Sequence, residues 1–236
     1  MRNSTRRNAF QCFRLAVTLT VAWLVQAQDL KAPNSSMAPL DQYLMGRAAE
    51  IALARTAAPA SIAQDAEVMV LGKQGYEIAF AGTNGFVCMV QRSWAAAFDD
   101  PLFWNPKLRG PTCFNPAAAR SYLPLILKKT DLVLAGRPKD QMVAAIGAAV
   151  NSKQLPAMEP GAMCYMLSKQ GYLSDAAGHW HPHLMFFLPL SDSGTWGAGL
   201  PGSQIFEAKD ETARITTFMV PVPKWSDGTL DVPEIH

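Results

Sequence analysis

The first apolar residues after the N-terminal region recur at helical spacing. They lie every three or four positions from Leu40 to Ala52, and charged residues lie outside this stripe. The pattern predicts a helix from about Leu40 to Ala57. Gly46 weakens the middle of this helix, and Pro59 ends it.

After this helix the apolar pattern changes to that of short strands. Apolar or alternating runs cover residues 67–71, 76–80 and 86–90, and turns rich in glycine separate them. Asn84-Gly85, in the second turn, is the dipeptide most typical of a two-residue hairpin. We therefore expect the three strands to form an antiparallel meander.

Residues 93–116 are predicted to form a long loop, because prolines recur through them. The loop also carries large aromatic residues, which are Trp94, Phe98, Phe103 and Trp104. Such a loop either packs its aromatic rings over the core or lines a binding surface.

Two helices are expected after this loop. One runs from Pro116 to about Leu134 with a kink at Pro124, and the other covers residues 139–152.

The C-terminal third returns to short apolar runs. These predict strands at residues 163–167, 183–188, 205–208 and 215–222, with a segment rich in glycine and serine at 191–203. Strands followed by helices and then by more strands are typical of an α+β fold. We expect a mainly antiparallel sheet with about three helices.

The first 27 residues have the features of a signal peptide. Four arginines and no acidic residue occur in them, residues 15–25 are uncharged and mostly apolar, and Val25-Gln26-Ala27 fits a cleavage site. A membrane-spanning helix needs about 20 apolar residues, which this run does not reach. We expect residues 1–27 to be removed, 28–37 to form a flexible leader and 38–236 to form a single α+β domain, in the periplasm or secreted.

Removal of the first 27 residues reverses the sign of the net charge. The whole chain has 21 basic and 19 acidic residues, and four of the basic residues lie in this segment, so that 17 against 19 leave a net charge of −2. This balance does not favour nucleic acid as a partner. No later apolar run is long enough to span a membrane, so we expect no stable membrane insertion after cleavage. The expected partner is a small ligand or a protein.

Three cysteines remain after cleavage, and an oxidising compartment favours a disulfide between two of them. We predict the pair Cys88–Cys113, because this bond would close the loop between them. A loop of this length is stabilised by about 3 kcal/mol on entropic grounds. Cys164 lies in an apolar run and is predicted to be a buried free thiol.

Three of the four histidines lie close together, at His179, His181 and His183. In a strand these alternate positions share a face, and imidazoles are common ligands of zinc and other divalent metals. His179 and His183 would lie about 13 Å apart in a straight strand, so one metal ion could use at most two of the three unless Pro182 bends the chain. The competing interpretation is that a polar loop simply carries these rings into a buried strand.

Two hypotheses follow, and no catalytic residue or organic-cofactor motif decides between them. The first is an exported binding module that uses the aromatic loop and the histidines as a concave face. The alternative is a metal-dependent hydrolase or oxygenase with His181 and His183 as ligands. Two histidine nitrogens close together beside a carboxylate would favour the enzyme. Imidazoles that point into solvent or bind backbone carbonyls would favour the module.

Overall fold

The computed structural model describes residues 36–191 and 193–232. The predicted signal peptide, most of the predicted leader and His236 lie outside the described residues. The described part has an α+β fold, as the sequence predicts, with one sheet of eight strands. No helix among the described residues is both long and apolar enough to cross a membrane.

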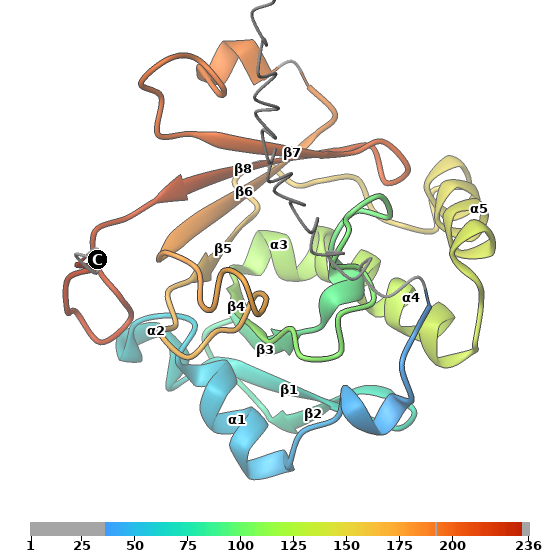
Figure 1. Cartoon of the computed structure of the whole chain (residues 1–236), viewed down its shortest axis with the longest axis horizontal. Helices are drawn as coiled ribbons and strands as arrows, with labels where there is room; N and C mark the ends of the chain where they lie inside the picture. The colour runs from blue at the N-terminus through green and yellow to red at the C-terminus, as the bar shows by residue number, and fades with distance from the viewer. Residues whose placement is uncertain (1–35, 192, 233–236) are drawn as a thin grey trace, which may run out of the picture. The chain divides into compact units, whose positions relative to one another are not determined.

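The strands lie in the order β2-β1-β3-β4-β5-β6-β8-β7 across the sheet, as Figure 1 shows from bottom to top. All neighbouring strands are antiparallel except β1 and β3, which are parallel. The strands are β1 (Glu67–Gly72), β2 (Gly75–Phe80), β3 (Val87–Gln91), β4 (Gly110–Phe114), β5 (Met163–Met166), β6 (His183–Pro189), β7 (Phe206–Asp210) and β8 (Ile215–Pro221).

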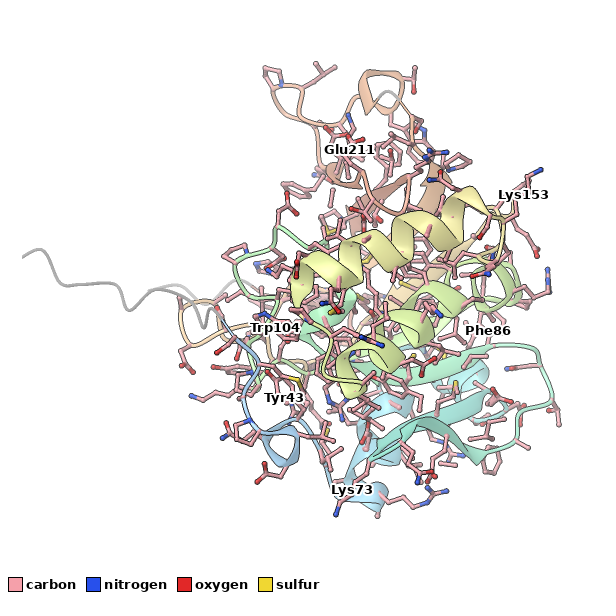
Figure 2. All side chains as sticks on the ribbon, turned by 90° about the vertical axis from the view of Figure 1, so that its right-hand side faces the viewer. Tyr43, Lys73, Phe86, Trp104, Lys153 and Glu211 are labelled. Carbon is pink, nitrogen blue, oxygen red and sulfur yellow. A yellow bond between two sulfur atoms is a disulfide. The ribbon has the colours of Figure 1, made fainter. Side chains whose placement is uncertain are left out.

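Helices cover both faces of the sheet, because alternate residues of its inner strands are apolar on both sides. Val68 packs with the first two helices on one face, and its neighbour Met69 packs with the other three on the opposite face. Figure 2 shows α4 and α5 in front of the sheet. The helices are α1 (Arg47–Arg55), α2 (Ala60–Ala63), α3 (Pro116–Ser121), α4 (Leu123–Leu134) and α5 (Lys139–Asn151), and short 3₁₀ helices occur at Leu40–Gln42, Ser93–Ala95 and Ser193–Trp196.

The predicted antiparallel meander is wrong in its third strand. β1 and β2 form the expected hairpin, but β3 lies on the other side of β1 and runs parallel to it. The four inner residues of β1 and the first four of β3 are buried, whereas β2 is exposed at half of its positions. Placing β3 next to β1 puts the two continuous apolar runs in the interior of the sheet and leaves the alternating run at its edge.

The connection from β2 to β3 depends on Gly82. A Cβ atom at this position would lie 2.0 Å from the backbone nitrogen of Glu67, so only glycine allows so close an approach to the start of β1. Asn84 does not form a two-residue hairpin. Its side-chain amide donates to the carbonyl of Ile62, and its side-chain oxygen accepts from the backbone nitrogen of Phe86. These contacts fix a crossing loop in place of a hairpin turn.

The helices also differ from the predicted ones in their bounds. The predicted helix over 40–57 begins only at Arg47, with Gly46 in extended conformation as its N-cap. The predicted kinked helix is two helices, α3 and α4, which meet at Tyr122, and Pro124 lies in the first turn of α4. A proline has no backbone N–H to donate and is therefore tolerated at a helix start better than inside one.

The predicted loop 93–116 contains a strand that the sequence analysis missed. β4 carries Pro111 and Gly110, two residues that disfavour strands, yet all five of its residues are buried between β3 and β5. Cys113 lies opposite Cys88 in the β3–β4 register, and the two form the predicted disulfide. Cys164 on β5 is free and buried, also as predicted, and burial raises the pKa of its thiol.

Candidate functional site

A cavity of about 420 Å³ lies over the C-terminal half of the sheet. One side of it is formed by residues of β5, β6 and β8, including His183, Met185, Phe187 and Thr217. The other side is formed by residues between Gln91 and Leu108, which come from the end of β3 and from the predicted loop 93–116 (the aromatic loop), together with Trp180 from the segment before β6. Strand residues therefore form one side of the cavity, and residues outside the strands form most of the other.

Alternation along β6 explains which residues reach this cavity. His183, Met185 and Phe187 are two positions apart and share one face of the sheet, and all three line the cavity. Phe187 also stacks on Tyr122, the residue between α3 and α4, with ring centroids 3.7 Å apart. The packing of the two rings forms one end of the cavity wall, since both residues line it.

The four large aromatic rings of the predicted loop are buried in the core and do not line this cavity. Trp94 donates from its indole nitrogen to Thr130 of α4 at 3.0 Å. The backbone carbonyl of Trp104 accepts a hydrogen bond from the Tyr43 hydroxyl, and these two residues appear close together in Figure 2. The rings thus anchor the loop, and other residues of this segment, including Ser93 and Ala95–Ala97, line the cavity.

The three histidines do not share a strand face. Only His183 belongs to β6, whereas His179 lies at a bend directly after a tight turn at residues 174–178. The ring of His179 packs near that of Trp225, with centroids 5.6 Å apart. His181 donates from Nδ1 to the Asp231 carboxylate at 2.6 Å. These two rings hold the C-terminal segment rather than facing the cavity.

His183 is the histidine that lines the cavity. Its Nδ1–H donates to the backbone carbonyl of His181 at 2.7 Å, and its Nε2 is buried without a hydrogen-bond partner. Burial lowers the pKa of this imidazole below its ordinary value, and the nearby His181 lowers it further, while the bond to the carbonyl opposes the shift. The ring is therefore held in its neutral form more strongly than a free histidine.

Trp180 forms the next part of the wall. Its ring lies nearly perpendicular to that of His183, with centroids 6.2 Å apart, and its indole nitrogen is buried without a partner. Gly171 fixes this position, because a Cβ atom there would lie 2.2 Å from the indole ring. Neither Trp180 nor Ser93 was identified as a site residue from the sequence. The sequence around Gly171 does not indicate that the indole of Trp180 packs against this glycine.

Three residues that line this cavity each carry a buried polar side-chain atom without a hydrogen-bond partner. These atoms are Ser93 Oγ, Trp180 Nε1 and His183 Nε2. The other buried side-chain atoms without partners among the described residues are Glu50 Oε2, Arg55 Nε and Ser191 Oγ, and none of these residues lines it. A second cavity of about 430 Å³, between α5 and the β7–β8 turn, has none of the six in its lining.

The predicted metal site is not assembled among the described residues. No three histidine, cysteine, aspartate or glutamate side chains in residues 36–191 and 193–232 lie close enough together to hold a metal ion. His181 and His183 each engage Nδ1 in a hydrogen bond within the protein. Metal binding at His179, His181 or His183 stays a prediction.

Comparisons with protein-family models, with curated proteins and with solved structures found no match to this chain.

Proposed function

We propose that this protein is an exported binding module for a small, mainly apolar ligand, which is held in the cavity between β5, β6 and β8 and the aromatic loop. The cavity lies within the usual size range of ligand pockets, and most of its lining side chains are apolar. Export is supported by the Cys88–Cys113 disulfide, since such bonds persist in oxidising compartments, and by the predicted signal peptide.

The observation that carries this proposal is that three residues of one cavity lining, Ser93, Trp180 and His183, each carry a buried polar atom without a partner. Buried polar atoms in native proteins are nearly always hydrogen-bonded, and each unpaired one costs about 1–3 kcal/mol. Three such costs in one place are hard to explain as packing. A ligand with complementary groups would supply the missing hydrogen bonds.

Water is the other candidate for these hydrogen bonds. A polar cavity of this size can hold ordered water that bonds to unpaired groups. Water would leave the apolar lining, including Met185 and Phe187, without a contact partner. Binding of an apolar probe distinguishes the two, because a cavity built only to hold water has no affinity for one.

The test is a fluorescence titration with the neutral, apolar fluorophore N-phenyl-1-naphthylamine. We expect saturable binding by the wild type and at least about tenfold weaker binding by Ala208→Phe, which places a ring in the cavity lining. Ala79→Phe is the matched control, because Ala79 also lies in an edge strand but lines neither of the two cavities. Absence of saturable binding, or equal binding by all three proteins, would contradict the proposal.

The metal-dependent enzyme remains the alternative, and a zinc titration of protein without an affinity tag tests it. The unpaired Nε2 of His183 is the one cavity-lining histidine nitrogen available to a metal ion. Micromolar zinc binding that is lost in both His183→Ala and His181→Ala would favour the enzyme. Zinc binding that neither substitution changes would place the metal elsewhere.

A further inference from the structure

The hydrogen-bonding role of His183 follows from its partner. A backbone carbonyl can only accept, so the proton on Nδ1 is the one donated to His181. A neutral imidazole carries one proton, and Nε2 is therefore a lone-pair acceptor. His183, a residue of the cavity lining, thus carries an atom that requires a donor.

Trp180 has the opposite role. An indole nitrogen can only donate, so the unpaired Nε1–H requires an acceptor. The rings of Trp180 and His183 lie 6.2 Å apart, centroid to centroid. The two unpaired atoms therefore belong to neighbouring rings of one cavity lining.

The cations of the lining already have anionic partners. Arg92 is buried and donates to Glu50 at 2.9 Å, and its other nitrogens donate to backbone carbonyls. Lys209 lies 3.9 Å from Glu207. An anionic ligand would therefore enter a mainly apolar cavity without a free positive charge, at a high desolvation cost.

The carboxylates of the lining are also engaged. Asp210 accepts from the buried Lys129 at 3.0 Å, and Asp100 accepts from the backbone nitrogen of Leu102. An ammonium ligand could donate to His183 but would leave the Trp180 N–H unpaired, because it has no acceptor.

On the basis of the proposed function, we infer that the ligand is a neutral apolar molecule that carries a hydroxyl group, which donates to His183 Nε2 and accepts from Trp180 Nε1. A hydroxyl is the smallest neutral group that does both. The Ser93 hydroxyl can donate or accept and completes the polar end of the cavity.

The experiment compares four naphthalene probes as competitors of the bound fluorophore at neutral pH. They share one ring system and differ in a single substituent: 2-naphthol, 2-methylnaphthalene, 2-naphthoate and 2-naphthylmethylammonium. We expect 2-naphthol to bind about tenfold tighter than 2-methylnaphthalene, because each added hydrogen bond contributes about 1 kcal/mol and two of them exceed the 1.4 kcal/mol of a tenfold change. The two ions should bind more weakly than 2-naphthol.

Two substitutions assign this preference to the residues. His183→Phe keeps a ring of similar shape and removes the acceptor, and Trp180→Phe removes the donor. Each should reduce the preference for 2-naphthol over 2-methylnaphthalene, which is measured as the ratio of the two affinities within the same variant. His179→Phe is the matched control, since His179 is a neighbouring ring outside the cavity lining, and it should keep the full preference.

The outcomes separate this inference from the proposed function. If the fluorophore does not bind, both are overturned. If the fluorophore binds and 2-naphthol fails to displace it, or has no advantage over 2-methylnaphthalene, or binds more weakly than either ion, only the inference is overturned. Circular dichroism of each variant shows whether the fold is kept, and the fluorophore titration of the same variants shows whether the cavity is kept.

Discussion

The two halves of the sheet are filled to different degrees. All residues of β4 and the central residues of β1 and β3 are buried, and helices and loop rings cover both faces. In contrast, β6 and β7 are mostly half-buried or exposed, and the cavity lies against β6 and β8. The first half is a closely packed scaffold, whereas the second half keeps space that side chains do not fill.

Both halves contain buried polar atoms without a partner, and these include Glu50 Oε2 and Arg55 Nε in the scaffold half. In that half, Arg92, which also reaches the cavity lining, uses Nε, Nη1 and Nη2 in hydrogen bonds and neutralises the buried Glu50. At the cavity, Trp180 and His183 each keep an atom without a partner. A protein can tolerate the free-energy cost of unpaired polar atoms where a ligand supplies their hydrogen bonds, provided that contacts elsewhere keep the fold stable. Close packing in the first half therefore permits unfilled space in the second.

The largest effect is expected from breaking the buried ion pair of the scaffold half. Arg92→Met would leave the Glu50 carboxylate buried without its positive partner, and we expect a loss of about 3–5 kcal/mol in the free energy of unfolding. Urea unfolding measures it. Arg47→Met is the control, because the Arg47–Glu77 pair is exposed and its loss should cost at most about 1 kcal/mol. Similar small losses in both variants would contradict the role assigned to Arg92.

A smaller effect is expected from removing the disulfide. The double variant Cys88→Ala/Cys113→Ala releases a loop with a sequence separation of 25, which should lower the free energy of unfolding by about 3 kcal/mol. Affinity for the naphthalene probes should change little, because neither cysteine lines the cavity. Cys164→Ala removes a buried thiol without breaking a cross-link and should cost about 1 kcal/mol. Loss of probe binding in the double variant, with the fold intact, would show that the cavity depends on the disulfide of the first half.

The smallest effect is expected from pH, and it concerns the cavity half. Burial lowers the pKa of His183 in the folded protein, so between the ordinary histidine value of about 6.5 and the lower folded value the unfolded chain binds a proton that the folded chain does not. The free energy of unfolding should therefore fall as pH decreases through this window, and the contribution of His183 should be fully present above pH 6.5.

Urea unfolding at pH 7.5 and pH 5.5 tests this on the wild type, His183→Gln and His179→Gln. The loss on acidification should be smaller in His183→Gln than in the other two proteins. An equal loss in all three would show that the cavity histidine does not titrate differently in the two states. The charge of His181 also lowers the pKa of His183, in addition to the larger effect of burial.

Local patterns predicted much of the fold. The apolar runs predicted seven of the eight strands, although with bounds that differ by a residue or two in several cases, and the disulfide followed from the two cysteines that flank one loop. β4 is the strand that the local apolar pattern did not predict. Pro111 and Gly110 suppress the strand signal, and burial between β3 and β5 stabilises the strand nevertheless.

The candidate site was predictable only in part. The histidine stretch pointed to His183, but the sequence could not separate it from His179 and His181, because spacing alone suggests a shared strand face. The turn at residues 174–178 and the partners Trp225 and Asp231 separate them, and both partners lie more than forty residues away along the chain.

The sequence by itself determined the α+β class, the disulfide and most of the strands, because each depends on residues near one another in the chain. Tertiary structure decided that β3 pairs with β1, where Gly82 lets the connection cross the backbone. It also decided that Ser93, Trp180 and His183 meet at one cavity. Strand order and cavity lining depend on which distant surfaces pack together, and that outcome is a sum over many weak contacts that no local pattern records.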